Sequence, residues 1–430
     1  MKNENTVIVR PARNIAGALR LPGDKSISHR YAMLAGIAEK DTKLENFSTG
    51  ADCASTLKGM AALGVESESK EGKMVFHGLG TEFRAPTHAL VFGNSGSTMR
   101  MLSGILAGQN FTSELIGDES LSRRPMARIV EPLEKMGARI SFAQGARPPL
   151  QITGGRLKAI EYRVPVPSAQ VKTCLLFAGL YAEGETQVGE AFRTRDHGEA
   201  ALRAFGAEVN LDGKKVTIAG GQTLHGIEAV VPGDLSSAAF FLCAAALFPE
   251  SQISIDWLLM NPSRARLLDI LISLGVRISV AQLEEKNGEL VGSVQVEGGK
   301  LKGVMITGGD TAALIDEIPV LAAIAPYTEE GIEVRDASEL RVKESDRIAS
   351  IATNLRAMGA EVEERQDGLK IPGRQRLHGA ELDSFGDHRI AMAFAVAALR
   401  AEGETSIRGA DAALISYPEF FETLEALLQR

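Results

Sequence analysis

One short pattern recurs along the whole chain, and it constrains the fold more than any other feature of the sequence. In five good copies, an apolar helix-like stretch ends at a glycine and alternating residues come next; the glycines are Gly64, Gly137, Gly206, Gly275 and Gly359. A degenerate sixth copy closes the chain, with Leu428 in the glycine's place. The pattern fits the last turns of an amphipathic helix, a left-handed cap and a strand. Single junctions of this kind are common in α/β proteins, but this repetition predicts six related units.

A second helix is expected upstream of the pattern in each unit, in stretches rich in alanine and leucine such as "YAMLAGIAEK" and "FFLCAAALFPE". These stretches are apolar nearly all round, so the helices should be buried. A chain of 430 residues is too long for one ordinary core and suits two domains of roughly 200 residues each. We therefore predict an α/β protein of two domains with three units each, and a boundary near residue 232 in "VVPGDLSS".

Composition excludes several classes of function. The net charge of -8 argues against a general nucleic-acid or membrane-surface binder, since either role usually needs an excess of basic residues. The cysteines Cys53, Cys174 and Cys243 are scattered and suggest neither a disulfide framework nor a zinc site. The N-terminus lacks the apolar core of a signal peptide and no run is long enough to span a membrane, so we expect a cytoplasmic protein.

The starts of the six buried helices carry the chemically informative residues. They read "PGDKSISHR", "FGNSGSTMR", "VPSAQVK", "PGDLSS", "IDEIP" and "FGDHRIAM". Most combine glycine or proline with Asp, Asn or Ser, which are ordinary helix caps, and for "PGDLSS" we interpret the motif as a cap only. The others add basic or amide groups, namely Lys25, Arg30, Arg100, Gln170, Lys172, His388 and Arg389. A cation is disfavoured in the first turn of a helix, so we predict that an anionic ligand completes the site.

Further cations lie in two short runs, "LSRRPMARI" with Arg124 and "ELRVKESDRIAS" with Lys343 and Arg347. On one helix Lys343 and Arg347 would be four residues apart and would repel each other. An isolated run of this kind is usually a solvated face, here neutralised by Glu344 and Asp346. Beside the other candidate anion sites, the two runs become candidates as well. Motifs for nucleotide hydrolysis, dinucleotide redox chemistry, serine esterases and zinc proteases are missing, so we expect no cofactor and no metal.

Taken together, these motifs are specific enough to indicate a protein family. The chain closely resembles the EPSP synthase (3-phosphoshikimate 1-carboxyvinyltransferase) family nearly end to end, through "LPGDKSISHR", "GNSGSTMRML", "SRRPMARIVEPL", "PSAQVK", "TRDHGEAALRAFGAEV", "PGDLSSAAFFL", "LIDEIPVLA", "LRVKESDRIA", "GDHRIAMAF" and "SYPEFFE". The resemblance implies a two-domain inverse α/β barrel, with three βαβαββ repeats around a pseudo-threefold axis in each domain. It also implies that the chain crosses between domains twice, so that residues 21–232 form one domain and residues 1–20 and 233–430 form the other.

The resemblance implies transfer of the enolpyruvyl group of phosphoenolpyruvate to the 5-hydroxyl of 3-phosphoshikimate, with release of phosphate, in the shikimate pathway of aromatic amino acid biosynthesis. By the family pattern, 3-phosphoshikimate is held by Lys25, Ser26, Arg30, Ser168, Ala169, Gln170, Arg195, Asp316 and Lys343. Phosphoenolpyruvate is held by Lys25, Gly96, Arg124, Gln170, Arg347 and Arg389.

Addition followed by elimination needs a base for the hydroxyl and an acid for the methylene carbon. Asp316 resembles the base and Glu344 the acid, and Lys25 could assist either step. The chain departs from common family patterns at Met101, at His29, where asparagine is frequent, and before "YPEFF", where several members carry lysine. Gly96 would leave room for a phosphoenolpyruvate mimic such as glyphosate.

Three rival functions are weaker. The related transferase acting on UDP-N-acetylglucosamine usually carries a reactive cysteine near the region matching Arg123 and Arg124, and none of the cysteines lies there. A non-catalytic anion-binding protein on the same fold would not require both Asp316 and Glu344. An RNA-end-processing enzyme is disfavoured by the net charge of -8. We therefore expect small-molecule substrates, no nucleic-acid or membrane partner, and a monomer.

Overall fold

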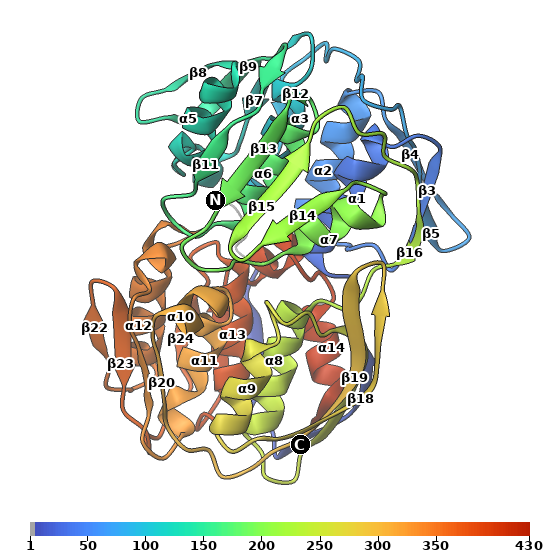
Figure 1. Cartoon of the computed structure of the whole chain (residues 1–430). Helices are drawn as coiled ribbons and strands as arrows, with labels where there is room; N and C mark the ends of the chain where they lie inside the picture. Colours follow the sequence, from blue (N-terminus) through green and yellow to red (C-terminus); the bar gives the residue numbers. More distant parts are fainter. Residues whose placement is uncertain (1–4) are drawn as a thin grey trace. The chain divides into compact units, whose positions relative to one another are not determined.

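The computed structural model describes residues 5–430 and divides the chain into two compact units. Unit 1 consists of Met1–Pro22, Pro232–Glu284 and Leu290–Arg430, and unit 2 of Gly23–Val231 with Glu285–Glu289. Each unit mixes helices and β-sheets (Figure 1). The chain is therefore an α/β protein, as the alternating sequence pattern predicted.

Unit 2 contains three four-stranded sheets with one shared topology, ordered β16-β3-β5-β4, β6-β7-β9-β8 and β11-β13-β15-β14. In each sheet the first pair of strands is parallel and the other pairs are antiparallel. The strands are β3 (Asp41–Glu45), β4 (Glu66–Lys70), β5 (Lys73–His77), β6 (Leu90–Val91), β7 (Thr112–Ile116), β8 (Arg139–Ala143), β9 (Arg147–Thr153), β11 (Glu161–Arg163), β13 (Glu185–Gly189), β14 (Val209–Asp212), β15 (Lys215–Ala219) and β16 (Glu228–Val230), and β10 (Leu157–Lys158) pairs separately with β12 (Ala182–Glu183).

The helices of unit 2 are α1 (Lys25–Ile37), α2 (Ala51–Ala62), α3 (Gly96–Ala107), α4 (Glu119–Ser122), α5 (Ala127–Met136), α6 (Ala169–Gly179) and α7 (His197–Ala204). Of these, α3 and α6 approach each other very closely. A Cβ atom built on Gly104 of α3 would lie 2.0 Å from the carbonyl oxygen of Cys174 in α6, so only glycine fits at this position. This packing brings together two elements whose first turns carry candidate site residues.

Unit 1 repeats the same sheet once, in the order β20-β21-β23-β22, and adds the sheets β1-β25-β24 and β18-β19-β17-β2-β26. Its strands are β1 (Val7–Val9), β2 (Asn14–Arg20), β17 (Gln252–Leu259), β18 (Arg277–Lys286), β19 (Glu289–Glu297), β20 (Val304–Ile306), β21 (Ile332–Val334), β22 (Glu363–Arg365), β23 (Gly368–Ile371), β24 (Glu381–Asp383), β25 (Thr405–Arg408) and β26 (Leu428–Gln429). Its helices are α8 (Leu235–Ala246), α9 (Arg266–Ser273), α10 (Gly309–Ala313), α11 (Ile318–Ile324), α12 (Arg347–Ala357), α13 (His388–Ala398) and α14 (Phe420–Leu427), with 3-10 turns η1 (Ala325–Tyr327), η2 (Ser338–Val342) and η3 (Ala410–Ile415).

The predicted helix-to-strand junctions are confirmed. All five pattern glycines have the left-handed backbone that the cap requires, with φ between +89° at Gly359 and +113° at Gly137. The sixth copy ends differently, because Leu428 has φ -77° and begins β26 directly after α14. A leucine can occupy that place because no left-handed residue is needed there.

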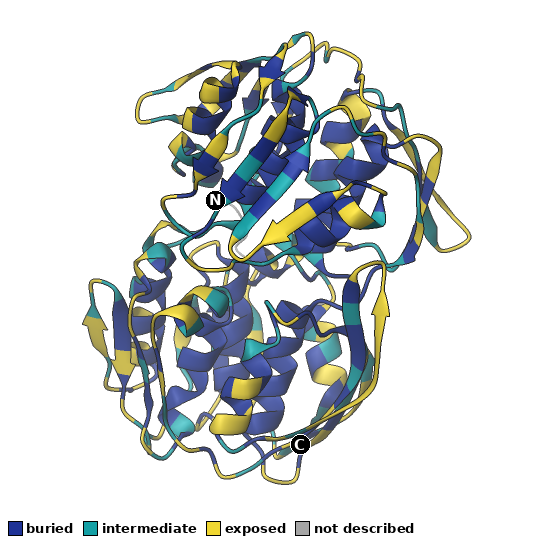
Figure 2. Cartoon of the chain, in the orientation of Figure 1, coloured by how far each residue is buried: buried dark blue, intermediate teal, exposed yellow. Residues whose placement is uncertain are grey.

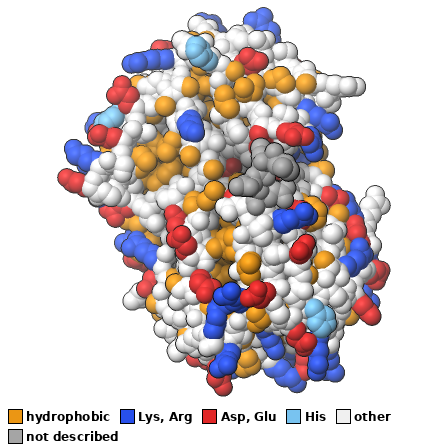
Figure 3. All heavy atoms as spheres, turned by 180° about the vertical axis from the view of Figure 1, so that it is seen from behind, with side chains coloured by type: hydrophobic (Ala, Val, Ile, Leu, Met, Phe, Trp, Pro, Cys, Tyr) orange, Lys and Arg blue, Asp and Glu red, His pale blue; other side chains and the backbone are white. Residues whose placement is uncertain are grey.

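The alanine-rich helices form the interior of each unit, as predicted. Every residue of α8 and of α13 is buried, and only the first two residues of α1 are not. Figure 2 shows these helices in the dark blue of buried residues, while yellow marks exposed outer strands and loops. On the face drawn in Figure 3, basic and acidic side chains are interspersed, as the mixed composition and net charge of -8 lead one to expect.

Candidate active site

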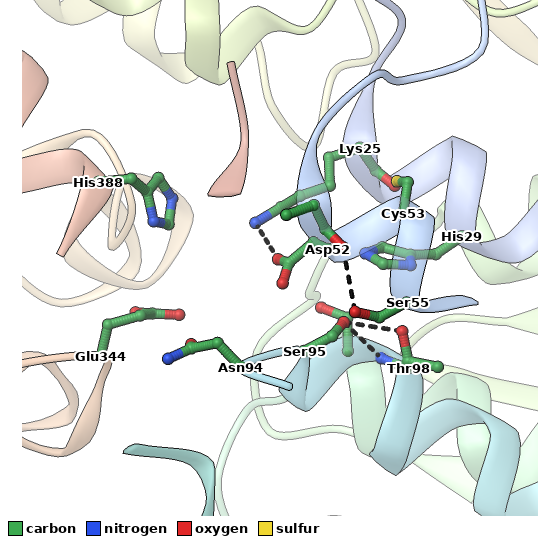
Figure 4. A network of polar contacts seen from close by, with 12 residues as sticks. Lys25, His29, Asp52, Cys53, Ser55, Asn94, Ser95, Thr98, Glu344 and His388 are labelled. Carbon is green, nitrogen blue, oxygen red and sulfur yellow. Dashed lines mark hydrogen bonds and ion pairs between the residues drawn. The ribbon is translucent and has the colours of Figure 1, made fainter. Parts of the chain in front are cut away.

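Lys25 is the first residue of α1, where its charge opposes the helix dipole. Asp24 caps the helix by accepting a hydrogen bond from the backbone N–H of Ile27 at 2.9 Å. The ammonium of Lys25 lies 2.9 Å from Oδ2 of Asp52, in the first turn of α2 (Figure 4). Asp52 was not predicted as a site residue, because nothing local marks it as a partner of a residue 27 positions earlier. Lys25 therefore has a protein counter-charge, and its side chain stays 16% exposed.

Arg30 lies one turn later on α1 and is buried. Its Nε and Nη2 atoms donate to the hydroxyl of Thr173 in α6, at 3.2 and 2.9 Å, and Nη1 donates to the carbonyl of Ser26. Burial lowers the pKa of Arg30 to about 10, and the charge of Arg195 adds to that effect while Glu199 opposes it. Arg30 therefore remains a cation at neutral pH and ties α1 to α6.

The first turns of α3 and α6 are linked through the amide of Gln170. Its Oε1 accepts from Nη1 of Arg100 at 2.8 Å, and its Nε2 donates to the hydroxyl of Ser97 at 2.9 Å. Ser168 caps α6 by accepting from the N–H of Val171, and Ala169 is the first residue of that helix. The predicted residues 168–170 thus sit together at one helix start, held against α3.

Gly96 begins α3 beside two arginines. A Cβ atom built at Gly96 would lie 3.0 Å from Nη1 of Arg100 and 3.3 Å from Nη1 of Arg124. Arg124 is buried and donates to Oδ1 of Asn94 at 2.5 Å and to the hydroxyl of Ser120. Unit 2 therefore gathers a bare backbone position and two guanidinium groups, an arrangement that suits a small anion.

Two candidate cations of unit 2 behave differently from Lys25. Lys172 is buried and forms 2.8 Å ion pairs with both Glu190 and Glu199, so its charge is used in the interior of unit 2. These ion pairs correct the interpretation of Lys172 as a ligand-binding cation. Arg195 lies just before α7 and is half-buried. Beyond burial, the charge of Arg195 also lowers the pKa of Arg30.

Arg347 is the centre of the predicted residues in unit 1. It is 1% exposed, and its guanidinium lies 3.3 Å from Oδ1 of Asp316, 2.6 Å from Oε2 of Glu344 and 2.8 Å from Oδ2 of Asp387. Burial by itself lowers the pKa of Arg347, but the three carboxylates outweigh it and raise the pKa above its ordinary value. The arginine is thus permanently charged and holds Asp316 and Glu344 beside each other.

Lys343 and Arg389 complete the unit 1 cluster. The Lys343 ammonium lies 3.5 Å from Oδ1 of Asp316, and Nη1 of Arg389 donates to the backbone carbonyl of Asp316 at 2.7 Å. Asp387, which was predicted only as part of a helix cap, does cap α13 by accepting from the N–H of Arg389. Its contact with Arg347, 40 residues away, could not be predicted from that local motif.

Lys343 and Arg347 do not lie on one helix, so the repulsion expected for residues four apart on a shared helix does not apply. The 3-10 turn η2 ends at Val342, Lys343 has an extended backbone, and α12 begins only at Arg347. Asp346 caps α12 by accepting from the N–H of Ala349, and it also accepts from Arg341 at 2.7 Å. The break between the two turns lets both cations reach Asp316 instead of each other.

Two properties of the described residues concern metal binding and membrane insertion. Within residues 5–430, no group of three or more His, Cys, Asp or Glu side chains is arranged to hold a metal ion. Over the same part of the chain, no helix has both the length and the apolarity needed to cross a bilayer.

Comparison with known proteins identifies the family. The family model for EPSP synthase (3-phosphoshikimate 1-carboxyvinyltransferase) matches residues 9–424. The 3-phosphoshikimate 1-carboxyvinyltransferases of Koribacter versatilis and Solibacter usitatus are 60% and 58% identical to this chain, over 99% and 98% of it and 100% and 99% of their own lengths. The structure of EPSP synthase from Acinetobacter baumannii is similar with a TM-score of 0.88 at 40% identity, covering 99% of this chain and 98% of that one. This chain therefore belongs to the EPSP synthase family.

Proposed function

We propose that this protein transfers the enolpyruvyl group of phosphoenolpyruvate to the 5-hydroxyl of 3-phosphoshikimate, releasing phosphate. The products are 5-enolpyruvylshikimate 3-phosphate and inorganic phosphate. Membership of the family and full-length identity of 60% to a 3-phosphoshikimate 1-carboxyvinyltransferase support this reaction. It is a step of the shikimate pathway, which leads to chorismate and the aromatic amino acids.

One observation carries the chemistry: two carboxylates share a single buried arginine. Asp316 and Glu344 both contact the guanidinium of Arg347, which is 1% exposed, while their own side chains are 18% and 17% exposed. The reaction needs one proton removed from a hydroxyl and one delivered to a carbon. A pair of partly exposed carboxylates, oriented by one cation, can serve these two tasks.

In the addition step, Asp316 accepts the proton of the 5-hydroxyl while the hydroxyl oxygen bonds to C2 of phosphoenolpyruvate. Glu344 delivers a proton to the methylene C3, which becomes a methyl group, and a tetrahedral adduct results. In the elimination step a methyl proton returns to Glu344, the C2–O bond breaks as the departing phosphate takes up the proton held by Asp316, and the double bond forms again. Lys25 assists either step by stabilising the charge on the phosphate.

Both substrates are anions, and the assigned contacts are mostly cationic or polar groups. For 3-phosphoshikimate we assign Lys25, Ser26, Arg30, Ser168, Ala169, Gln170, Arg195, Asp316 and Lys343. For phosphoenolpyruvate we assign Lys25, Gly96, Arg124, Gln170, Arg347 and Arg389. The grouping of Gly96 with Arg100 and Arg124, and of Arg347 with Arg389 around Asp316, supports these assignments.

The finer architecture belongs to the same proposal. We assign residues 21–232 to one enolpyruvyl transferase domain and residues 1–20 with 233–430 to the other. Each domain is proposed as an inverse α/β barrel of three βαβαββ repeats around a pseudo-threefold axis, and the repeated four-stranded sheets support it. We also propose that the protein acts as a cytoplasmic monomer without a cofactor, and that glyphosate competes with phosphoenolpyruvate at Gly96.

The test is phosphate release from phosphoenolpyruvate with either 3-phosphoshikimate or UDP-N-acetylglucosamine as acceptor. Wild type should release phosphate only with 3-phosphoshikimate. Asp316→Asn and Glu344→Gln should each lower kcat by about 100-fold or more, the usual contribution of a positioned acid or base. The carboxylates Asp411 and Glu422 offer matched controls outside the cluster, and D411N and E422Q should behave as wild type. Release only with the sugar nucleotide would overturn the assigned substrate.

A further inference from the structure

A chain of buried hydrogen bonds runs through unit 2 from α1 to the start of α3. Nδ1 of His29 lies 2.7 Å from the hydroxyl of Thr56, which lies 2.7 Å from the hydroxyl of Thr98. Thr98 in turn lies 2.7 Å from the hydroxyl of Ser95. The four side chains belong to residues that are at most 1% exposed, and Figure 4 shows His29, Ser95 and Thr98 in this region.

The first link of this hydrogen-bond chain follows from helical spacing. His29 comes four residues after Lys25 on α1, and Thr56 comes four residues after Asp52 on α2. Residues four apart lie on one face of a helix, so the two helices meet twice. The first contact is the Lys25–Asp52 ion pair at the helix starts, and the second is the His29–Thr56 hydrogen bond one turn further along.

The imidazole enters this chain as a neutral group. Burial lowers the pKa of His29 to about 3; Asp52 opposes that shift, and Lys25 and Arg30 add to it. At neutral pH the ring therefore has one N–H and one lone pair, and Nε2 has no hydrogen-bond partner among residues 5–430. Nδ1 is thus the atom through which the ring acts on its surroundings.

The far end of the chain is the cap of α3. The hydroxyl of Ser95 accepts from the backbone N–H of Thr98 at 3.3 Å, which fixes the first turn of the helix. The next residue is Gly96, where an added Cβ atom would lie 3.0 Å from Nη1 of Arg100 and 3.3 Å from Nη1 of Arg124. Small movements of Ser95 would therefore change the spacing between the Gly96 backbone and the two guanidinium groups.

We propose that His29 is a positioning residue for phosphoenolpyruvate, acting through Thr56 and Thr98 on the Ser95 cap and so on the backbone at Gly96. This inference rests on the proposed function, because it takes Gly96 and Arg124 as contacts of that substrate. His29 itself touches neither substrate. It sets the geometry of the phosphoenolpyruvate contact without adding a charge to a region that already holds several cations.

The test compares Thr56→Val, which keeps the shape and removes the hydroxyl, with Thr56→Ser, which keeps the hydroxyl. T56V should raise KM for phosphoenolpyruvate roughly fivefold or more, the usual weight of one hydrogen bond, and leave KM for 3-phosphoshikimate and kcat within about twofold. T56S should restore the wild-type values. A lower melting temperature with unchanged KM for phosphoenolpyruvate, or an equal change in all kinetic parameters, would overturn the proposal.

Variants of His29 provide an independent comparison if T56V does not fold. The side-chain amide of asparagine can place a polar atom near the position of Nδ1, whereas leucine cannot. His29→Asn should keep KM for phosphoenolpyruvate within about twofold of wild type, and His29→Leu should raise it roughly fivefold. Equal values for the two variants would overturn the proposed action of His29 on the Gly96 backbone.

The backbone amide resonance of Gly96 separates this proposal from the proposed function. We expect the resonance to shift in T56V and H29L and to stay near its wild-type position in T56S and H29N, whether or not the enzyme turns over. If wild type fails to use 3-phosphoshikimate, the proposed function is wrong. The Gly96 resonance then still tests whether the hydrogen bonds from His29 set the Gly96 backbone. An unshifted resonance in T56V and H29L would refute the proposed action of His29 on the Gly96 backbone, even in a fully active enzyme.

Discussion

The starts of α1 and α8 share the letters Pro-Gly-Asp and differ at the next position. In both, the aspartate caps the helix: Asp24 accepts from the N–H of Ile27, and Asp234 accepts from the N–H groups of Ser236 and Ser237. The residue after the aspartate is a lysine in unit 2 and a leucine, Leu235, in unit 1. The caps are thus equivalent, and only one of the two starts presents a cation.

The side chains around the two starts extend this difference. At α8, Nη2 of Arg264 donates to the hydroxyl of Ser236 at 2.6 Å and lies 3.5 Å from Asp234, and Ser236 donates to Glu317. All of these groups are buried. At α1, Lys25 keeps 16% of its side-chain surface exposed. A cap motif alone therefore does not reveal a ligand site; the distinguishing feature is whether the protein's own charges fill the helix start or leave it accessible.

Removal of the Lys25 charge should break the comparison most strongly. Lys25→Met keeps an unbranched side chain but loses the ammonium that we assign to both substrates. We expect kcat/KM to fall about 1,000-fold, the cost of losing a charged contact in a site that also needs it for catalysis. Leu235→Met, at the matching position of α8, should leave kcat/KM within about twofold. Steady-state kinetics would check both values, and more than a tenth of wild-type activity in K25M would contradict the assignment.

Loss of Arg264 should instead affect stability. Arg264→Met removes the buried cation beside Asp234 and the donor to Ser236, which should lower the free energy of unfolding by about 3 kcal/mol. Arg266 is a suitable control, since it is 41% exposed and pairs with Asp310 at the surface, and R266M should cost less than about 1 kcal/mol. Urea denaturation would measure both. Similar losses in the two variants would show that the α8 start is not stabilised in this way.

His29 in α1 has a titratable side chain, whereas its counterpart in α8, Ala239, has none. The native pKa of about 3 lies below the unfolded value of 6.5, so as the pH falls the unfolded chain takes up a proton that the native state refuses. Stability from this group is therefore full above pH 6.5 and is lost as the pH falls towards 3. Relative to His29→Asn, wild type should lose about 2 kcal/mol between pH 7 and pH 5. Parallel stability curves for the two proteins would contradict a neutral buried imidazole.

A methyl group at Gly96 should have the smallest of these effects. In Gly96→Ala the new Cβ would crowd the ends of the Arg100 and Arg124 side chains at 3.0 and 3.3 Å. Those ends can shift, so the fold should lose less than about 1 kcal/mol, whereas KM for phosphoenolpyruvate should rise about tenfold because the substrate loses close access to the backbone. Kinetics with both substrates would show the selectivity. An equal rise in KM for 3-phosphoshikimate would place Gly96 elsewhere in the site.

Features set by neighbouring residues were predictable from the sequence. The five left-handed glycines and the six helix starts depend on local backbone preference and apolar periodicity, and all of them lie where the pattern placed them. The family could likewise be identified from the order of the motifs. These are properties of short segments, which keep their preferences in the folded chain.

The pairing of charges was not predictable in the same way. Asp52 reaches Lys25 across 27 residues, Asp387 reaches Arg347 across 40, and Glu190 reaches Lys172 across 18. Each of these pairs depends on how helices and loops pack, and no local motif encodes that packing. For the same reason the sequence showed Lys172 as a candidate ligand cation, and the break before α12 that separates Lys343 from Arg347 was hidden.

Binding of 3-phosphoshikimate, measured by titration calorimetry on wild type, K25M and L235M, tests the central claim most directly. The account predicts one equivalent bound per chain in wild type and L235M, and an affinity at least about 100-fold weaker in K25M, because, of the two helix starts compared, α1 presents an accessible cation and α8 does not. Wild-type affinity in K25M, or loss of binding in L235M, would contradict the distinction between the two helix starts.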